Sequence, residues 1–303
     1  MHGAARAEVQ PVRAIASSGA AIQVCNVTQV YGEAHLAKTV VEDCSFEIEK
    51  GKLTVMVGPS GCGKSTLIRL IAGFEKPTSG QVIMEGRPVD GPDRDRLVVF
   101  QETALFPWMT TYDNIMFGPR VRHEVTADTR DAVDRLLDTV GLRQFRHKYP
   151  TQLSGGMQRR AELARAMINR PHMMILDEPF RGLDAMSKVL MWDYYARLFE
   201  GSERTDFFVT TDIDEGIFLA DRIFIMTNKP ARVRAILEVD LPRPRNLSDI
   251  VQNDRANAIK MEALSLLHEE AMKSFTGGSK AATDFIDAYT RRFADEKGAS
   301  TSE

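Results

Sequence analysis

A glycine-rich turn near the start of the chain carries a lysine and hydroxyl side chains at a fixed spacing. The stretch GPSGCGKST satisfies the pattern G-x-x-x-x-G-K-[ST], and it lies between an apolar run and a helix-like segment. Backbone N–H groups and the helix N-terminus can surround phosphate oxygens there, and Lys64 adds positive charge for the β- and γ-phosphates. The Ser65 hydroxyl can coordinate Mg²⁺. The predicted phosphate-binding residues are Gly58, Pro59, Ser60, Gly61, Cys62, Gly63, Lys64, Ser65 and Thr66.

Two adjacent carboxylates follow a second apolar run, MMILDEPF. A buried strand would place both where the sheet opens onto the phosphates. Asp177 would then hold Mg²⁺ through water, and Glu178 would polarise the attacking water as a general base. An acidic strand end can also be a solvated turn, but the phosphate-binding turn upstream favours a catalytic site.

The stretch QLSGGMQRRAELARA lies between these two motifs. Ser154 can cap a helix that begins at the two glycines, and the free N–H groups of a helix start attract anions. SerGlyGly is also a common turn, so composition alone assigns no function to it.

Short apolar runs alternate with helix-like segments along the chain, which predicts an α/β fold with a parallel, helix-covered sheet. Partly alternating runs from Ala21 onward predict half-buried strands, and residues 53–57 predict a strand buried on both faces. Further buried strands are predicted at 97–100, 173–176, 207–210 and 223–226, and helices at 64–72, 127–140, 156–169 and 184–199.

The amino-acid composition is typical of a globular protein and argues against several classes of protein. The chain has 303 residues, of which 43% are hydrophobic, and its net charge of -3 offers no basic field for nucleic acid. The three cysteines have neither paired spacing nor a histidine cluster, so we expect no disulfide framework or zinc site. No apolar run reaches the ~18 to 20 residues of a spanning helix, and the start lacks a secretory signal. A membrane function would therefore need another chain to cross the bilayer.

Three regions are predicted. Residues 1–20 form a flexible leader, residues 21–240 form the main domain, and residues 241–303 form a helical extension with a disordered end. The boundary is set at LPRPRN, because each proline removes a backbone donor and restricts the preceding residue. Apolar residues keep helical spacing beyond it, at Met261, Leu264, Leu267, Ala271 and Phe275 and again at Ile286, Tyr289 and Phe293.

Together these motifs resemble the ATP-binding cassette family over roughly Ile22 to Val239, with Gly58 to Thr66 as Walker A, Leu153 to Met157 as the signature and Met173 to Glu178 as Walker B. The resemblance implies a P-loop ATPase with a parallel-sheet core, an antiparallel β subdomain and a helical subdomain at about 102–170. It also implies a head-to-tail dimer of cassettes, homomeric or heteromeric, that holds MgATP between its subunits. The signature residues that would contact the partner's γ-phosphate are Ser154, Gly155, Gly156 and Met157.

The resemblance assigns further positions one by one. Tyr31 matches the aromatic residue that stacks on adenine, although an aromatic there can equally be core packing. Gln101 matches the glutamine that contacts Mg²⁺ and the attacking water, and Asp184 matches the aspartate of the dimer-contacting D-loop. The implied metal ligands are Ser65, Gln101 and Asp177.

Phe106, Pro107 and Trp108 lie in a predicted loop directly after Gln101. Exposed aromatics there predict a surface that docks on a permease, whereas a buried Trp108 would anchor a helical subdomain. The LeuPheProTrp stretch, DEPFRGLDAM and the later PRPR are similar to the importer branch for nitrate, sulfonate, taurine and bicarbonate.

One position departs from the family pattern: Thr211 stands where the switch histidine belongs. Histidine offers a long donor that can carry charge, whereas threonine has one short neutral hydroxyl. We expect hydrolysis to persist, slowly or in tuned form, because Lys64, Gln101, Asp177 and Glu178 are present. Thr211 and Asp212 can alternatively be a simple helix cap.

Three functions follow as hypotheses. The first is the ATPase subunit of an importer for a small anionic solute, peripheral to the cytoplasmic face of the inner membrane and acting with a multispanning permease and indirectly with an extracytoplasmic solute-binding protein. The second is a cassette of DNA repair or translation, but the chain has neither heptads nor a second Walker A. The third is a nucleotide-gated regulator that scarcely hydrolyses ATP, suggested by Thr211 and the helical tail.

Overall fold

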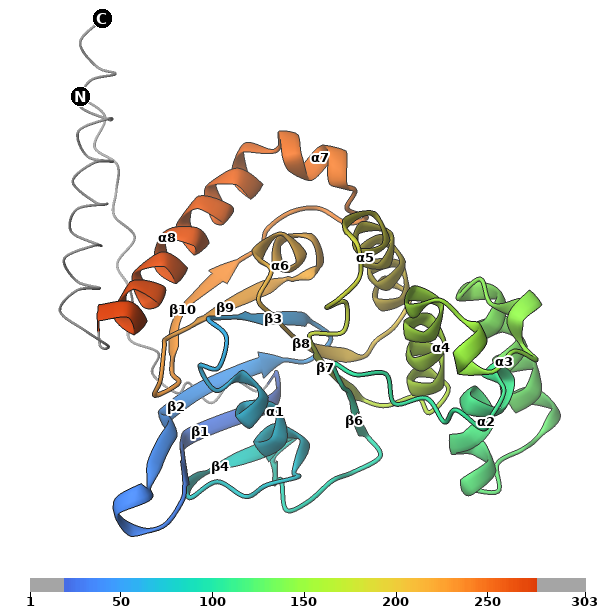
Figure 1. Ribbon diagram of the computed structural model, residues 1–303, viewed down its shortest axis with the longest axis horizontal. Coiled ribbons are helices and arrows are strands. Elements are labelled where there is room, and N and C mark those ends of the chain that lie inside the picture. Colours follow the sequence, from blue (N-terminus) through green and yellow to red (C-terminus); the bar gives the residue numbers. More distant parts are fainter. Residues whose placement is uncertain (1–18, 277–303) are drawn as a thin grey trace, which may run out of the picture.

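A computed structural model describes residues 19–276 of the chain (Figure 1). Its centre is a six-stranded sheet in the order β10-β9-β3-β8-β7-β6, parallel except for the antiparallel edge strand β10. These strands are β3 (Leu53–Val57), β6 (Arg96–Val99), β7 (Met173–Asp177), β8 (Thr205–Thr210), β9 (Arg222–Met226) and β10 (Val233–Glu238). The predicted strands are confirmed except at Phe100, which lies beyond the end of β6 and is 43% exposed. The uniformly buried β3 and β8 show why their sequences lack alternation.

A second, antiparallel sheet in the order β2-β1-β4-β5 covers one face of the central sheet together with α1 (Lys64–Ala72). Phe46 of β2 packs against Phe207 of β8 and Phe224 of β9 across this interface. The strands are β1 (Ala20–Tyr31), β2 (Lys38–Glu49), β4 (Ser79–Met84) and β5 (Arg87–Pro88).

Helices α5 (Ala185–Glu200), α6 (Ile213–Leu219) and α8 (Asp254–Thr276) contribute to the core on the opposite face. Trp192 and Tyr195 of α5 are the largest side chains that α5 places there. Of the helices in residues 19–276, none is both long and apolar enough to cross a membrane.

A helical subdomain protrudes to one side of the sheets, drawn in green in Figure 1. It contains α2 (Thr111–Val121), α3 (Ala127–Thr139) and α4 (Gly155–Met167), which share an apolar core of their own. Each of the three helices begins at a hydroxyl residue that accepts from a backbone N–H, namely Thr110, Thr126 and Ser154.

Helices α7 (Leu247–Gln252) and α8 follow the predicted domain boundary between residues 240 and 241. The division into two domains at this point stays a prediction. Leu241 and Ile259 nevertheless belong to the same apolar core as β3 and β8. The leader up to residue 18 and the helical spacing at Ile286, Tyr289 and Phe293 lie outside the described residues.

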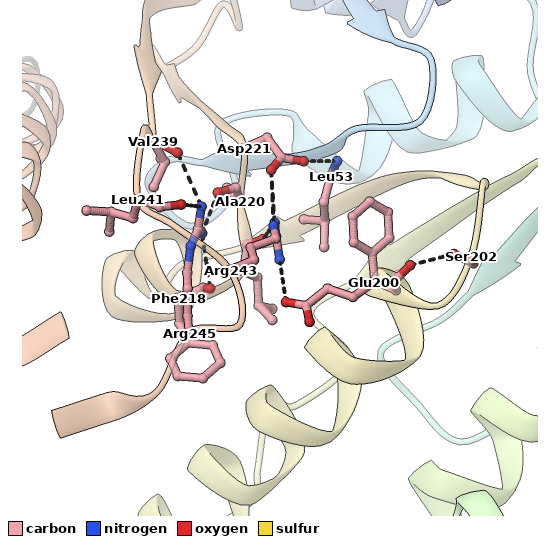
Figure 2. Close-up of polar contacts among 12 residues, drawn as sticks. Leu53, Glu200, Ser202, Phe218, Ala220, Asp221, Val239, Leu241, Arg243 and Arg245 are labelled. Carbon is pink, nitrogen blue, oxygen red and sulfur yellow. Dashed lines mark hydrogen bonds and ion pairs between the residues drawn. The ribbon is translucent and has the colours of Figure 1, made fainter. Parts of the chain in front are cut away.

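Arg245 joins the extension to the cassette (Figure 2). Its buried guanidinium donates to the carbonyls of Phe218 and Ala220 at the end of α6, at 3.2 and 2.6 Å, and to Val239 and Leu241, at 3.2 and 3.1 Å. Burial, followed by repulsion from Arg243, lowers the pKa of Arg245 to about 10, so the side chain keeps its charge at neutral pH. The cation satisfies the carbonyls at a helix C-terminus, where positive charge is favoured.

Candidate active site

The predicted phosphate-binding turn joins β3 to α1, as expected. Gly63 has a φ of 124°, and a Cβ added there would lie 2.9 Å from that of Ala231, so a larger residue is excluded. Lys64 is buried, and its Nζ donates to the carbonyls of Gly58 (2.8 Å) and Pro59 (2.9 Å). The backbone of the turn therefore surrounds the ammonium group of Lys64 at the N-terminus of α1.

Asp177 ends β7 and accepts a hydrogen bond from the hydroxyl of Ser65, the second residue of α1. Burial, with a smaller contribution from the Glu178 charge, raises the pKa of Asp177. A hydroxyl and a carboxylate that converge at a phosphate-binding turn are hard oxygen donors of the kind that Mg²⁺ takes. The two residues therefore fit the magnesium ion of the sequence prediction.

Glu178 lies one residue beyond β7, in the left-handed backbone region with a φ of 42°. Its N–H donates to the carbonyl of Val209 on β8 (2.8 Å), which fixes the backbone to the sheet. One carboxylate oxygen forms an ion pair with Nη1 of Arg181 at 3.0 Å. The same Nη1 lies 3.4 Å from Oε1 of Gln101, so Glu178 and Gln101 meet at one guanidinium.

Arg181 was missed by the sequence interpretation. The signal was present: a cation three residues after the candidate base, in a turn closed by the Gly182 φ of 81°. Spacing alone did not indicate that the side chain folds back.

Two buried charged residues connect the loop that contains Gln101, here called the glutamine loop, to α4, the helix that begins with the signature. The sequence interpretation gave neither residue a role. Arg159 of α4 donates to the carbonyls of Phe100 (2.8 Å) and Gln101, and pairs with Glu162 at 2.5 Å. Glu162 in turn accepts from the N–H of Ala104 (2.9 Å). Burial raises the pKa of Glu162 and lowers that of Arg159, and each partner's charge opposes the shift. A movement of the signature helix would therefore be transmitted to Gln101.

The signature residues begin α4, as predicted. Ser154 accepts from the N–H of Met157 (3.4 Å), and Ser154 and Gly155 are exposed. Within residues 19–276, no hydrogen bond joins Ser154 to the phosphate-binding turn of its own chain. The signature is thus presented on the surface of the helical subdomain.

The switch position lies between β8 and α6. Thr211 is exposed, and Asp212, not Thr211, caps α6 by accepting from the N–H groups of Asp214 (3.0 Å) and Glu215 (3.4 Å). Lys188 of α5 holds the other Asp212 oxygen at 3.0 Å. The turn is therefore fixed by its neighbours and leaves Thr211 facing solvent.

A carboxyl group lies buried beneath this turn. Glu215 accepts from Nε1 of Trp192 at 2.7 Å, and burial raises its pKa to about 7, while hydrogen bonds from Thr210 and Trp192 oppose the shift. Its protonation state therefore changes near neutral pH.

The roles of Tyr31 in adenine stacking and of Asp184 in the dimer contact stay predictions. Tyr31 ends β1, donates its hydroxyl to Glu75, and is half-buried against the core beside Thr66 of the phosphate-binding turn. Asp184 is exposed and caps α5 by accepting from the N–H of Ser187 (3.0 Å).

Trp108 is 69% exposed, so the interpretation as a buried anchor was wrong. The Phe106 ring lies 5.4 Å from that of Trp108 and 4.7 Å from that of Phe117, and Arg165 lies over it at 5.1 Å. Phe106 thus anchors the loop and leaves the indole at the surface.

Comparison with known proteins agrees with this geometry. The family model described as ABC transporter matches residues 41–181. The nitrate import ATP-binding protein NrtD of Synechococcus elongatus is 42% identical over 231 residues, 75% of this chain and 84% of that protein. The chain belongs to the ABC transporter family. The aliphatic sulfonates import ATP-binding protein SsuB of Bacillus licheniformis is 38% identical over 77% of this chain and 90% of its own length.

An ABC cassette of solved structure shows the same fold. A dimeric ATP-binding cassette in a post-hydrolysis state, bound to ADP and Pi, superimposes with a TM-score of 0.63 at 25% identity over 73% of this chain and 100% of its own. The predicted fold, the ATPase activity and the import-subunit hypothesis are confirmed, and the import hypothesis is favoured over the regulator.

Proposed function

We propose that two cassettes bind MgATP head to tail and that its hydrolysis drives uptake of a small oxyanion through a separate permease. The strongest support is that Glu178 and Gln101 share the Arg181 guanidinium and that Asp177, next to Glu178, contacts Ser65 of the phosphate-binding turn. Ser154, in contrast, is exposed on another subdomain. A second cassette is therefore needed to bring a signature to the phosphates. The names of the nitrate and sulfonate relatives support an anionic solute.

Each residue has a definite task in this proposal. Lys64 leaves its carbonyl partners to bind the β- and γ-phosphates, and Tyr31 stacks on the adenine. Glu178 accepts a proton from the attacking water, which Gln101 orients. Ser65 and Asp177 hold Mg²⁺, with Gln101 adding its amide oxygen. When bound, the ion neutralises charge on the phosphate oxygens.

The exposed indole supports the proposed partner. Trp108, with Phe106 and Pro107, forms an aromatic surface at the helical subdomain that suits a permease helix. The cassette would then lie at the cytoplasmic face of the inner membrane, and a solute-binding protein would act on the other side.

Phosphate release from MgATP tests the proposal, with wild type, Glu178→Gln and Thr211→His measured with and without the permease. We expect Glu178→Gln to abolish turnover, because it removes the proton acceptor while preserving size. We expect Thr211→His to raise turnover, because it restores a charged donor. Binding of ATP without turnover by wild type, even with its permease, would favour the regulator instead.

A further inference from the structure

The guanidinium of Arg181 occupies a place where a positive charge has chemical consequences. Its Nη1 lies 3.0 Å from Oε2 of Glu178 and 3.4 Å from Oε1 of Gln101. These are the two side chains that the proposed function assigns to the attacking water. If these roles hold, the cation lies beside the groups that act on the attacking water.

The arrangement leaves both partners able to act. Only one carboxylate oxygen of Glu178 is paired in the described part of the chain, so the other remains to accept a proton from water. Of the guanidinium nitrogens of Arg181, only Nη1 has a hydrogen-bond partner in residues 19–276, and the side chain is 60% exposed. A guanidinium has five N–H groups, so several remain to reach a phosphate oxygen.

The switch turn supplies no such charge. Thr211 is neutral, short and exposed, and Lys188, which contacts this turn, is already paired with Asp212. Phosphoryl transfer requires cations around the oxygens of the transferred group, and an arginine added at this point accelerates it strongly. Without another cation on this side, Thr211 would leave charge in the transition state uncompensated.

We propose that Arg181 supplies the cation that Thr211 does not, by contacting the γ-phosphate in the transition state while it holds Glu178 and Gln101 in register. The inference depends on the proposed roles of these two residues. It explains why the chain can hydrolyse ATP with a threonine at the switch position.

Arg181→Ala and Arg181→Lys test the inference, with Arg197→Ala as the matched control. Arg197 also has an exposed side chain that forms an ion pair, with Asp193 at 2.8 Å on α5, and this pair lies away from Glu178 and Gln101 in sequence. We expect Arg181→Ala to lower kcat about 10²-fold with little change in KM, because the contact forms only in the transition state. Arg181→Lys should retain part of the wild-type kcat, and Arg197→Ala should retain all of it. Added guanidinium should partly restore the kcat of Arg181→Ala.

Binding gives a second measurement that a purely structural residue would not change in this way. Arg181→Ala should weaken trapping of MgADP with vanadate, a transition-state mimic, but leave the affinity for a non-hydrolysable ATP analogue unchanged. Thr211→His should raise kcat more in the Arg181→Ala background than in wild type, since the two cations replace each other.

Unchanged or increased kcat in Arg181→Ala would overturn the inference, as would equal loss of vanadate trapping and of analogue binding. Failure of the proposed function would give a different result. In that case the wild type would show no ATP turnover, or a turnover that Glu178→Gln does not abolish.

Discussion

Hydrogen bonds and ion pairs to neighbouring residues fix the position of the candidate catalytic side chains. Glu178 is held twice, by the bond from its N–H to Val209 and by the ion pair with Arg181. Asp177 is held by the hydroxyl of Ser65. The proposed base, Glu178, and the proposed metal ligand, Asp177, are consecutive residues that can have different tasks because the backbone turns at the end of β7.

Lys64→Ala should reduce ATP affinity by at least about tenfold, because the buried ammonium is the only charged side chain within the phosphate-binding turn itself. Titration with a fluorescent ATP analogue measures the loss. Lys52→Ala, at an exposed position before β3, is the control and should bind normally. Equal affinity of both variants would contradict the assigned role.

Glu215 makes stability depend on pH. Burial raises its pKa from 4.5 to about 7, so its contribution to stability is complete below about pH 4.5 and is lost as the pH rises through 7. Glu215→Gln removes this loss while keeping an acceptor for Trp192. Urea unfolding should show the variant gaining about 2 kcal/mol relative to wild type between about pH 5 and about pH 8. Parallel pH profiles of the two proteins would refute the assignment.

At the scale of elements, the signature helix and the glutamine loop form one unit. Arg159 and Glu162 of α4 contact Phe100, Gln101 and Ala104, all in the connection from β6. Since the signature begins the same helix, rotation of the helical subdomain on dimer closure would reposition Gln101. In the proposed dimer, the Arg159–Glu162 pair would thus link the arrival of the partner to the residues that position the attacking water.

The C-terminal extension similarly holds α6, the helix that follows the switch turn. Arg245→Met leaves buried carbonyls at the end of α6 without a donor and should cost about 3 kcal/mol of unfolding free energy. Chemical denaturation measures it. The control is Arg255→Met, whose ion pair with Asp240 (2.8 Å) is exposed, and we expect little change. Equal stability of the two variants would contradict the anchoring role.

In the proposed function, the molecule as a whole carries two separate halves of an active site. Its phosphate-binding turn and its signature belong to different subdomains, and no hydrogen bond or ion pair joins them in residues 19–276. A heterologous pairing of two cassettes would bring each signature to the other's turn.

Mixed subunits test this pairing. Lys64→Ala and Ser154→Arg should each be inactive alone, because each homodimer lacks one half of both sites. Their mixture should recover turnover, since a mixed dimer has one intact site. No recovery after exchange of subunits, verified by differently tagged chains, would show that this cassette does not pair with itself in this way.

Trp108→Ala should weaken assembly with the permease at least about tenfold, because a largely exposed indole is a typical energetic anchor of an interface. Co-purification and permease-stimulated turnover measure this, and basal turnover should stay unchanged. Val121→Ala, at another exposed apolar position of the same subdomain, is the control. Stimulation equal to wild type would contradict the docking role.

Features that depend on neighbouring residues alone could be predicted from the sequence. A phosphate-binding turn needs glycines, a lysine and a helix start within a few residues, so GPSGCGKST located it without a structure. Uniformly apolar runs likewise predicted the buried strands of the central sheet, because a strand covered on both faces has no polar side.

Contacts between residues far apart in the chain could not be predicted in this way. Arg181 reaches Gln101 across 80 positions, and Arg245 reaches the end of α6 from the extension. Exposure of Trp108 was equally undecidable, because an aromatic residue in a loop is compatible with both burial and docking. Such contacts depend on how strands and helices are arranged in space, and the spacing of residue types along the chain does not encode that arrangement locally.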